Sequence, residues 1–168
     1  MADDHTEVLA ARTRMVRFQL RARDITDEAV LAAMTHVARH AFVPEHLQHL
    51  AYDDGPLPIG EGQTISQPYV VASMSQALKL SADHTVLEVG TGSGYGAAVL
   101  AQLAGVVHTI ERHADLAARA AHTLGRLGCD NVSVHVGDGT QGWAAAAPYD
   151  GISITAAAIE VPQPLLDQ

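Results

Sequence analysis

The sequence contains a single cysteine, Cys129, among its 168 residues. One cysteine excludes an internal disulfide and a zinc site built from several cysteines. Basic residues are also scarce, because 10 Lys and Arg face 19 Asp and Glu. The net charge of −9 argues against nonspecific binding to nucleic acid, which requires a basic surface. The arginines near the N-terminus are therefore interpreted as a solvated helix face.

Long apolar runs are missing too. The first twenty residues, MADDHTEVLAARTRMVRFQL, are acidic and then basic, which is unlike a signal peptide. No apolar stretch reaches the roughly 20 residues that a membrane-spanning helix requires. Hydrophobic residues make up 48% of the chain and charged residues 17%, which is typical of a globular protein. We expect a monomer in the cytoplasm, with neither a membrane nor a nucleic-acid partner.

Ten histidines raise the question of a metal site. His36 and His40 are one helical turn apart, and His46 and His49 are similarly spaced. However, neither an HExxH motif nor a cysteine pair accompanies them. We therefore expect no metal.

The chain divides into two parts of different character within one compact domain. Residues 1–80 are predicted to form helices over residues 8–21, 26–37 and 69–80. Thr26 is the predicted N-cap of the second helix. Between the second and third helices lies AYDDGPLPIGEGQTISQP, which is rich in Gly and Pro and shows little periodicity. We expect it to be a functional loop, and the family resemblance described below implies that it covers substrate and cofactor.

Residues 81–168 alternate short apolar strands with helices, which indicates an α/β fold. The predicted strands cover residues 85–89, 106–110, 132–136 and 151–155. The predicted helices cover residues 96–103 and 114–127. Right-handed crossovers between parallel strands give a doubly wound, Rossmann-like sheet. The fourth strand is expected to be an unprotected edge.

The strongest local motif is VLEVGTGSGYG, in which a strand runs into a Gly-rich turn and then a helix. Gly90, Gly92 and Gly94 allow a positive φ and the close approach of a ligand. An open α/β sheet binds nucleotide-like ligands at this place. The spacing GxGxG differs from the dinucleotide fingerprint GxGxxG, which holds a pyrophosphate. S-adenosylmethionine contains no phosphate and suits the observed spacing; the alternative is an ordinary tight turn.

Acidic residues lie at or near the ends of successive predicted strands. Glu111, in TIER, can accept hydrogen bonds from ribose hydroxyls. Asp138, in GDG, can accept one from the adenine amine, with the N–H of Gly139 close by. Glu88 could reach the ligand's ammonium group, or could be a strand carboxylate satisfied by backbone donors. Taken together, these residues predict an adenosine pocket, although Asp138 alone would be an ordinary turn residue.

Several motifs together resemble the bacterial type of protein-L-isoaspartate O-methyltransferase. They are RHAFVPE, AYDDGPLPIGEGQTISQPYVVASM, VLEVGTGSGY, TIER, NVSVHVGDG, GW, APYD and ITAAA. GxGxG alone marks the large methyltransferase superfamily, whereas LPIGEGQTISQP is far more specific. The resemblance implies a class I methyltransferase fold with an N-terminal helical extension. It also implies S-adenosyl-L-methionine as cofactor, and methyl esterification of the α-carboxyl group of L-isoaspartyl residues in damaged proteins and peptides.

The resemblance also implies roles for single residues. The family's active-site serine falls on Ser66, which would orient the substrate carboxylate. No G-x-S-x-G motif or Ser–His pair surrounds it, so no covalent role is assigned. A carboxylate is already ionised at neutral pH and requires no general base. The implied cofactor-binding residues are Gln63, Thr64, Ile65, Ser66, Glu88, Gly90, Thr91, Gly92, Ser93, Gly94, Glu111, Asp138, Gly139, Thr155 and Ala156.

The family pattern continues into a further strand and hairpin that this sequence lacks. We therefore expect a C-terminally truncated chain whose sheet is incomplete at the C-terminus. Two alternatives stay open: a related O-methyltransferase acting on aspartate in a modified peptide, and an inactive cofactor-binding fragment. A nicotinamide dehydrogenase is disfavoured by the GxGxG spacing and by the GDG motif.

Overall fold

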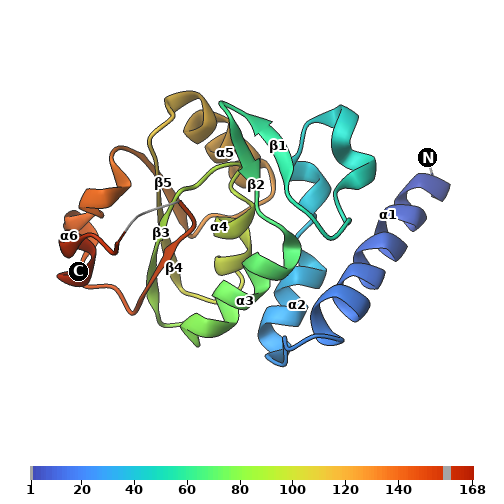
Figure 1. Ribbon diagram of the computed structural model, residues 1–168, viewed down its shortest axis with the longest axis horizontal. Helices are drawn as coiled ribbons and strands as arrows, with labels where there is room; N and C mark the ends of the chain where they lie inside the picture. The colour runs from blue at the N-terminus through green and yellow to red at the C-terminus, as the bar shows by residue number, and fades with distance from the viewer. Residues whose placement is uncertain (1, 157–159) are drawn as a thin grey trace.

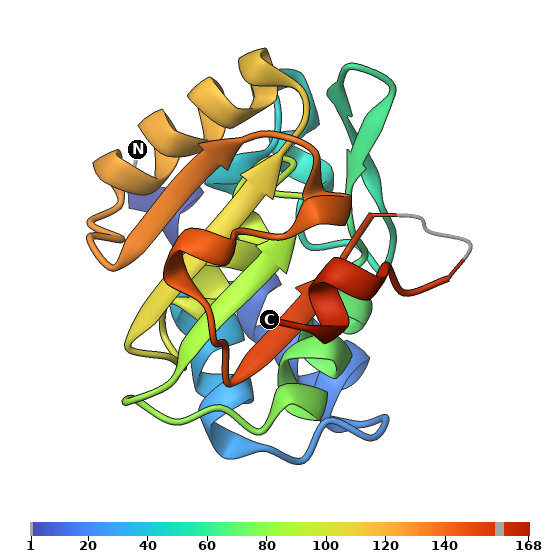
Figure 2. The same ribbon diagram turned by 90° about the vertical axis from the view of Figure 1, so that its left-hand side faces the viewer.

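A four-stranded parallel sheet forms the centre of the molecule. The computed structural model describes residues 2–156 and 160–168. The sheet contains β3 (Thr85–Val89), β4 (Val106–Glu111), β5 (Val132–Val136) and β6 (Gly151–Ile154). The strands lie in the order β5-β4-β3-β6, with helical segments on both faces (Figures 1 and 2). The predicted α/β fold with a doubly wound sheet is confirmed.

The parallel register brings the carboxyl ends of all four strands to one edge. Val89 lies opposite Ile110 of β4 and Ile154 of β6, and Ile110 lies opposite His135 of β5. The chain proceeds outward from β3 to β5 and then returns to the other side of β3 to form β6. The strand order therefore reverses beside β3, and open α/β sheets bind ligands at such a switch point.

The two faces of the sheet have different covers. One is covered by α3 (Pro68–Leu78), α4 (Tyr95–Leu100) and α5 (Ala114–Arg126). The other is covered by the short segments η4 (Gly139–Gln141), η5 (Ala144–Ala146) and α6 (Gln163–Leu166), which lie in front of the sheet in Figure 2. Alternate side chains of β3 divide between two cores: Val86 packs on the first face, and Leu87 and Val89 pack with Leu165 of α6.

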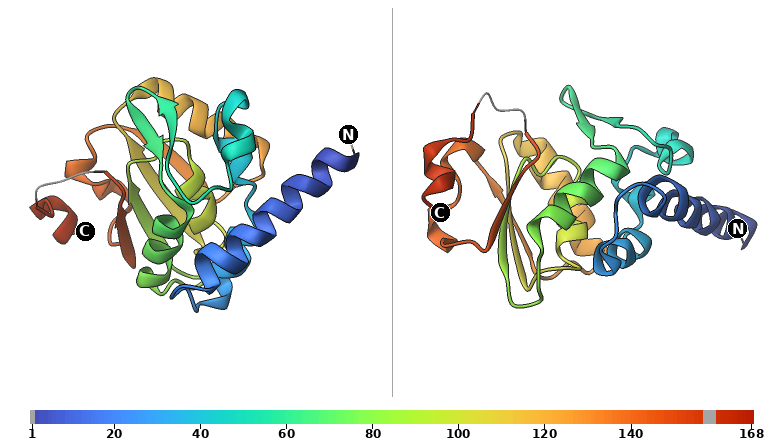
Figure 3. Two further views of the ribbon diagram at one scale, coloured as in Figure 1. Left: turned by 45° about the vertical axis from the view of Figure 1, so that its right-hand side comes forward. Right: turned by 60° about the horizontal axis from the view of Figure 1, so that its bottom comes forward.

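A long N-terminal helix packs against the helical side of the molecule (Figure 3). It begins as α1 (Ala2–Arg14) and continues as a π-helical segment, η1 (Met15–Arg21). The helix therefore starts earlier than the predicted residue 8, and its hydrogen-bonding pattern changes from α to π at Met15. Met15, Val16 and Leu20 are buried and anchor it to the core. No helix in the described part of the chain is both long and apolar enough to cross a bilayer.

The second helix is α2 (Glu28–His36), and its N-cap lies one residue later than predicted. Asp27 is its N-cap, because its carboxylate accepts hydrogen bonds from the N–H groups of Ala29 and Val30. The prediction of Thr26 as the cap is wrong. The backbone N–H of Thr26 donates to Gln76 of α3 instead, and this contact fixes the chain ahead of the helix.

The segment predicted as an irregular loop contains a β-hairpin. Two short 3₁₀ segments, η2 (Arg39–Phe42) and η3 (Glu45–Leu50), precede it. β1 (Leu57–Gly60) and β2 (Gln63–Ile65) then pair in antiparallel fashion. The chain reverses through Glu61 and Gly62, which both have positive φ. The hairpin projects beside α4 and α5, near the edge where the strands of the sheet end (Figure 1).

Candidate active site

The turn between β3 and α4 allows very close contact with β6. Gly90 and Gly92 have φ values of +99° and +54°, in the left-handed region that favours glycine. A Cβ atom on Gly90 would lie only 2.6 Å from Thr155 Oγ1. The Thr155 hydroxyl lies 2.9 Å from the carbonyl oxygen of Val89 and 2.7 Å from that of Gly90, and donates in this direction. The turn is therefore bound to the end of β6 and leaves its own backbone open to a ligand.

Gly94 packs closely against α5. It precedes α4 with a φ of +90° and does not line the cavity described below. A Cβ atom there would lie 3.2 Å from Leu124 Cδ1 and 3.3 Å from Ala120 Cβ on α5. The glycine therefore allows the helix to begin close to α5, and its contact with the cofactor stays a prediction.

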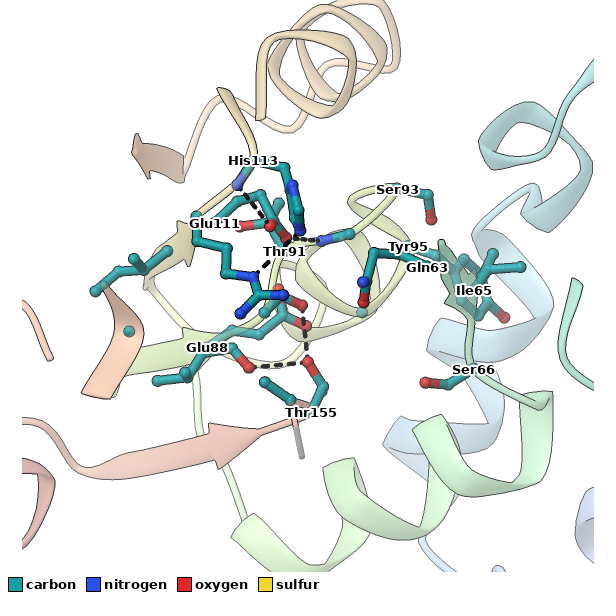
Figure 4. Close-up of a pocket in the computed structure, with 18 of the residues that line it drawn as sticks. Gln63, Ile65, Ser66, Glu88, Thr91, Ser93, Tyr95, Glu111, His113 and Thr155 are labelled. Atoms are coloured by element: carbon teal, nitrogen blue, oxygen red, sulfur yellow. Dashed lines mark hydrogen bonds between the residues drawn. The ribbon is translucent and has the colours of Figure 1, made fainter. Parts of the chain in front are cut away.

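Glu111 connects the ends of β3 and β4. Its side chain is buried, its Oε2 accepts from the N–H of Gly92 at 2.9 Å, and its Oε1 accepts from the N–H of His113 at 3.0 Å. These backbone donors orient the carboxylate toward the Gly-rich turn (Figure 4). Each carboxylate oxygen can accept a second hydrogen bond, so Glu111 retains capacity for a pair of ligand hydroxyls.

Glu88 is a buried carboxyl group inside β3. Only 2% of its surface is exposed, and its Oε2 accepts from the hydroxyl of Thr109 at 2.8 Å. The hydroxyls of Thr109 and Thr91 are in turn 2.6 Å apart. Burial raises the pKa of Glu88 to about 8, against an ordinary value of 4.5. Because no basic side chain of the described residues forms an ion pair with it, a cationic ligand group would stabilise its charged form.

Asp138 and Gly139 follow β5 at the same edge of the sheet. Asp138 caps η4, because its Oδ1 accepts from the N–H of Thr140 at 3.0 Å and from its hydroxyl at 2.8 Å. These hydrogen bonds lower the pKa of Asp138. At Gly139 a Cβ atom would lie 2.4 Å from Val89 Cγ1, so only glycine allows this segment to lie against β3.

The TIS segment (residues 64–66) lies across from these acids. Figure 4 shows Gln63, Ile65 and Ser66 on one side of the site, with Glu111 and Thr155 on the other. The Ser66 side chain points into the space between them. The backbone carbonyl of Ser66 accepts a hydrogen bond from Arg39, whose side chain is fully buried. Arg39 was not predicted from the sequence, since nothing in RHAFVPE distinguishes a buried arginine from a solvated one.

These segments enclose a cavity of about 450 Å³. This volume falls within the roughly 300–1,000 Å³ that is typical of sites for small molecules. Apart from Gly94, every residue predicted to contact the cofactor lines the cavity, so residues from four strand ends and the hairpin meet in one place. Among the described residues, no cluster of three or more His, Cys, Asp or Glu could hold a metal ion.

Eight further residues line the cavity and were not predicted: Val71, Val89, Tyr95, Gly96, Ile110, Arg112, His113 and Thr140. Arg112 and His113 directly follow Glu111, and Thr140 directly follows Gly139, so their place beside a predicted contact was an available signal. Val71 and Tyr95 belong to helices whose orientation toward the cavity depends on packing.

Comparison with known proteins identifies the family. The sequence profile described as protein-L-isoaspartate(D-aspartate) O-methyltransferase matches residues 11–168. The chain belongs to this family. A protein-L-isoaspartate O-methyltransferase of Methanoculleus marisnigri is 58% identical over 157 residues, which make up 94% of this chain and 71% of that protein. Protein-L-isoaspartate O-methyltransferase 1 of Rhodopseudomonas palustris is 55% identical over 168 residues, which make up all of this chain and 69% of that protein.

A solved structure of a protein described as a member of the same family has the same fold as this chain. A Plasmodium falciparum chain, described as a protein-L-isoaspartate O-methyltransferase in complex with S-adenosyl-L-homocysteine, superposes with a TM-score of 0.79 at 26% identity. The superposition covers 91% of this chain and 77% of that one. Methyltransferases of this family use S-adenosyl-L-methionine, and the bound S-adenosyl-L-homocysteine is the form that remains after methyl transfer.

Proposed function

We propose that this chain transfers a methyl group from S-adenosyl-L-methionine to the α-carboxylate of L-isoaspartyl residues in proteins and peptides. One observation supports this most strongly. The Gly-rich turn, the acids at and near the strand ends and the TIS segment converge on a single cavity of about 450 Å³. The first two features suit an adenosine with a charged amino-acid group. The third places a serine hydroxyl where a substrate could approach.

The residues around the cavity fit the cofactor group by group. Glu111 would accept hydrogen bonds from the ribose hydroxyls with the lone pairs that its backbone donors leave free. Asp138 and Gly139 would hold the edge of the adenine. Glu88, buried without a cation, would face the ammonium group. The close packing at Gly90 leaves backbone rather than side chains against the ligand.

The reaction requires little from the protein beyond binding, orientation and exclusion of water. The cofactor supplies an electrophilic methyl group on a positively charged sulfur. The substrate carboxylate is ionised at neutral pH, so no side chain has to remove a proton. Ser66 would donate a hydrogen bond to one carboxylate oxygen and aim the other at the methyl group. Residues 63–66 would cover the reacting atoms and keep water away from them.

We assign different tasks to the two parts of the chain. Residues 81–168 would form the cofactor-binding core, and residues 1–80 would cover cofactor and substrate. The partner would be an isoaspartyl protein or peptide, since the net charge of −9 disfavours a nucleic acid. A single cysteine suits the reducing cytoplasm. We expect the protein to act as a monomer.

Substitution of Ser66 by alanine tests the proposed role of the hydroxyl. A hydrogen bond to a charged group contributes about 1.5–3 kcal/mol, so kcat should fall roughly 10- to 150-fold. Calorimetric affinity for S-adenosyl-L-homocysteine should stay within about twofold of the original value. Ser133→Ala, at an exposed position of β5 outside the cavity, is the matched control and should change neither quantity. An equal loss of cofactor affinity in Ser66→Ala would make Ser66 a structural residue.

The substrate itself is tested with two peptides of the same sequence. One contains an L-isoaspartyl residue and the other the ordinary L-aspartyl residue. Methylation of the isoaspartyl peptide alone is the expected result. Preference for the aspartyl peptide would support the related O-methyltransferase. Binding of S-adenosyl-L-homocysteine without methylation of either peptide would support a cofactor-binding fragment.

A further inference from the structure

Arg39 is a buried cation without an acidic partner. Its side chain is fully inaccessible to solvent, and burial lowers its pKa. The two arginine–carboxylate pairs among the described residues, Arg21–Glu28 and Arg23–Asp54, lie elsewhere and are partly exposed. An arginine remains charged in proteins, and the burial of an unpaired charge is costly. Because no ion pair offsets the desolvation of its charge, the burial of Arg39 calls for a functional explanation.

The guanidinium group binds three backbone carbonyls of one segment. Its Nε donates to Ala51 at 2.7 Å, one terminal nitrogen donates to Ser66 at 2.8 Å, and the other donates to Gly55 at 3.3 Å. These carbonyls lie before and after the β1–β2 hairpin. Arg39 therefore holds both ends of the segment that carries the TIS motif, and its rigid fork matches three separate acceptors.

The same group also contacts the cofactor side of the site. The guanidinium carbon of Arg39 lies 5.0 Å from the centre of the Tyr95 ring, a distance suited to a cation–π interaction. Tyr95 is the first residue of α4, directly after the Gly-rich turn, and it lines the cavity. Arg39 therefore lies between the serine segment and the cofactor turn.

The charges around the cavity give Arg39 a second effect. Two carboxylates that line the cavity, those of Glu111 and Asp138, oppose the entry of an anionic substrate. Arg112 also lines it, but lies at the end of β4, where its charge helps to lower the pKa of Asp138. Arg39 supplies a positive charge from the protein next to Ser66, and because the guanidinium group is buried, solvent screens this charge little.

We propose that Arg39 is a positioning residue that holds Ser66 in place and supplies the positive potential that attracts the substrate carboxylate. This inference rests on the proposed function, since it requires an anionic substrate at Ser66. It assigns two separable properties to one side chain. The fork geometry fixes the serine and acts on kcat. The charge favours carboxylate binding and acts on KM.

Three variants separate these properties from a merely structural role. Arg39→Gln and Arg39→Met keep a long side chain without the charge, and should raise the KM for an isoaspartyl peptide at least tenfold. Arg39→Lys keeps the charge and should restore most of this loss, while kcat stays reduced because the fork is missing. In all three, calorimetric affinity for S-adenosyl-L-homocysteine should change less than threefold. Equal KM values across the three variants would overturn the charge effect.

A double-mutant cycle tests whether Arg39 acts through Ser66. If it does, Arg39→Lys should lower kcat much less in the Ser66→Ala background than in the original protein. Multiplicative, independent losses would show that the two residues act separately and would overturn the positioning role. Thermal unfolding of each variant shows whether it is folded under the assay conditions.

The original protein provides a test that does not depend on folding of the variants. A peptide with a neutral α-carboxamide in place of the isoaspartyl α-carboxylate should bind more weakly than the substrate. Its inhibition constant should be at least tenfold higher than the KM of the matching isoaspartyl peptide. Equal binding of carboxamide and carboxylate peptides would contradict the charge effect. If the original protein methylates no isoaspartyl peptide, the proposed function fails. If the original protein methylates the isoaspartyl peptide and the Arg39 variants have the same KM and kcat as the original, only the proposed role of Arg39 fails.

Discussion

Glu88 combines a buried position with an acidic side chain, and its protonation therefore depends on the fold. Its pKa is raised to about 8 by burial, while the hydrogen bond from Thr109 acts in the opposite direction and lowers it. An unfolded chain would ionise this carboxyl group near its ordinary value of 4.5. Between these two values the folded protein binds one proton more than the unfolded chain, so its stability falls as the pH rises.

The substitution Glu88→Gln should remove this pH dependence. Between pH 5 and pH 8 the original protein should lose roughly 2–4 kcal/mol of unfolding free energy more than the variant, because each pKa unit corresponds to about 1.4 kcal/mol. Urea unfolding at the two pH values measures the difference. Burial lowers the pKa values of His108 and His135, so these residues make the folded protein more stable as the pH rises over the same range. This contribution is the same in the original protein and in Glu88→Gln and does not affect the comparison. The exposed Glu45→Gln is the control, and parallel curves for Glu88→Gln and the original protein would refute the prediction.

The predictability of single residues depended on what their neighbours in the sequence revealed. Glu111 and Asp138 were predicted because each follows a short apolar strand, and parallel strands end at one edge. Arg39 was not predicted because its burial results from contacts with carbonyls at residues 51, 55 and 66. Such contacts depend on tertiary structure and leave no local pattern. Gly94 was assigned to the ligand because spacing alone does not separate a ligand contact from helix packing.

At the scale of elements, the beginning of α2 shows how closely two candidate caps can compete. Thr26 and Asp27 are adjacent and both belong to the residue types that cap helices. Only Asp27 accepts hydrogen bonds from the first N–H groups of the helix, whereas the side chain of Gln76 holds the backbone at both positions. The choice depends on where α3 fixes the chain, which the sequence alone does not show.

This pair provides a matched test of the cap. Asp27→Ala should lower the free energy of unfolding by about 1 kcal/mol, because two N–H groups lose their acceptor. Thr26→Ala should change it by less than about 0.5 kcal/mol, since the backbone hydrogen bond to Gln76 remains. Chemical denaturation of both variants gives the comparison. A larger effect at Thr26 than at Asp27 would restore the cap predicted from the sequence.

The other elements were predicted to different degrees for physical reasons. The strands over residues 85–89 and 132–136 were located correctly because each is a short run rich in valine bounded by turn residues. The β1–β2 hairpin was missed because its strands have four and three residues, one of them Pro58, and are too short to show alternation. The π-helical winding of residues 15–21 was missed because a single π turn leaves the helical pattern of apolar residues almost unchanged.

At the scale of the whole molecule, the cavity joins regions that are distant in the sequence. The hairpin contributes residues 63–66, the β3–α4 turn contributes residues 90–93, and the ends of β5 and β6 contribute Asp138 and Thr155. The first core cluster contains residues from both sides of position 80, so the cover and the sheet share their packing. A ligand that contacts all of these segments should therefore stabilise the folded molecule as a unit.

S-adenosyl-L-homocysteine should raise the thermal unfolding temperature by an amount set by its affinity. At a ligand concentration 100 times the dissociation constant, the stabilisation is about 2.7 kcal/mol. For a chain of 168 residues this corresponds to an increase of roughly 5–10 °C. Scanning calorimetry with increasing ligand measures the shift. NADH at the same concentrations should cause no comparable shift, because the GxGxG turn lacks the spacing of a pyrophosphate site. An equal shift with NADH, or none with S-adenosyl-L-homocysteine at millimolar concentration, would show that the convergence of these segments does not form an adenosylmethionine site.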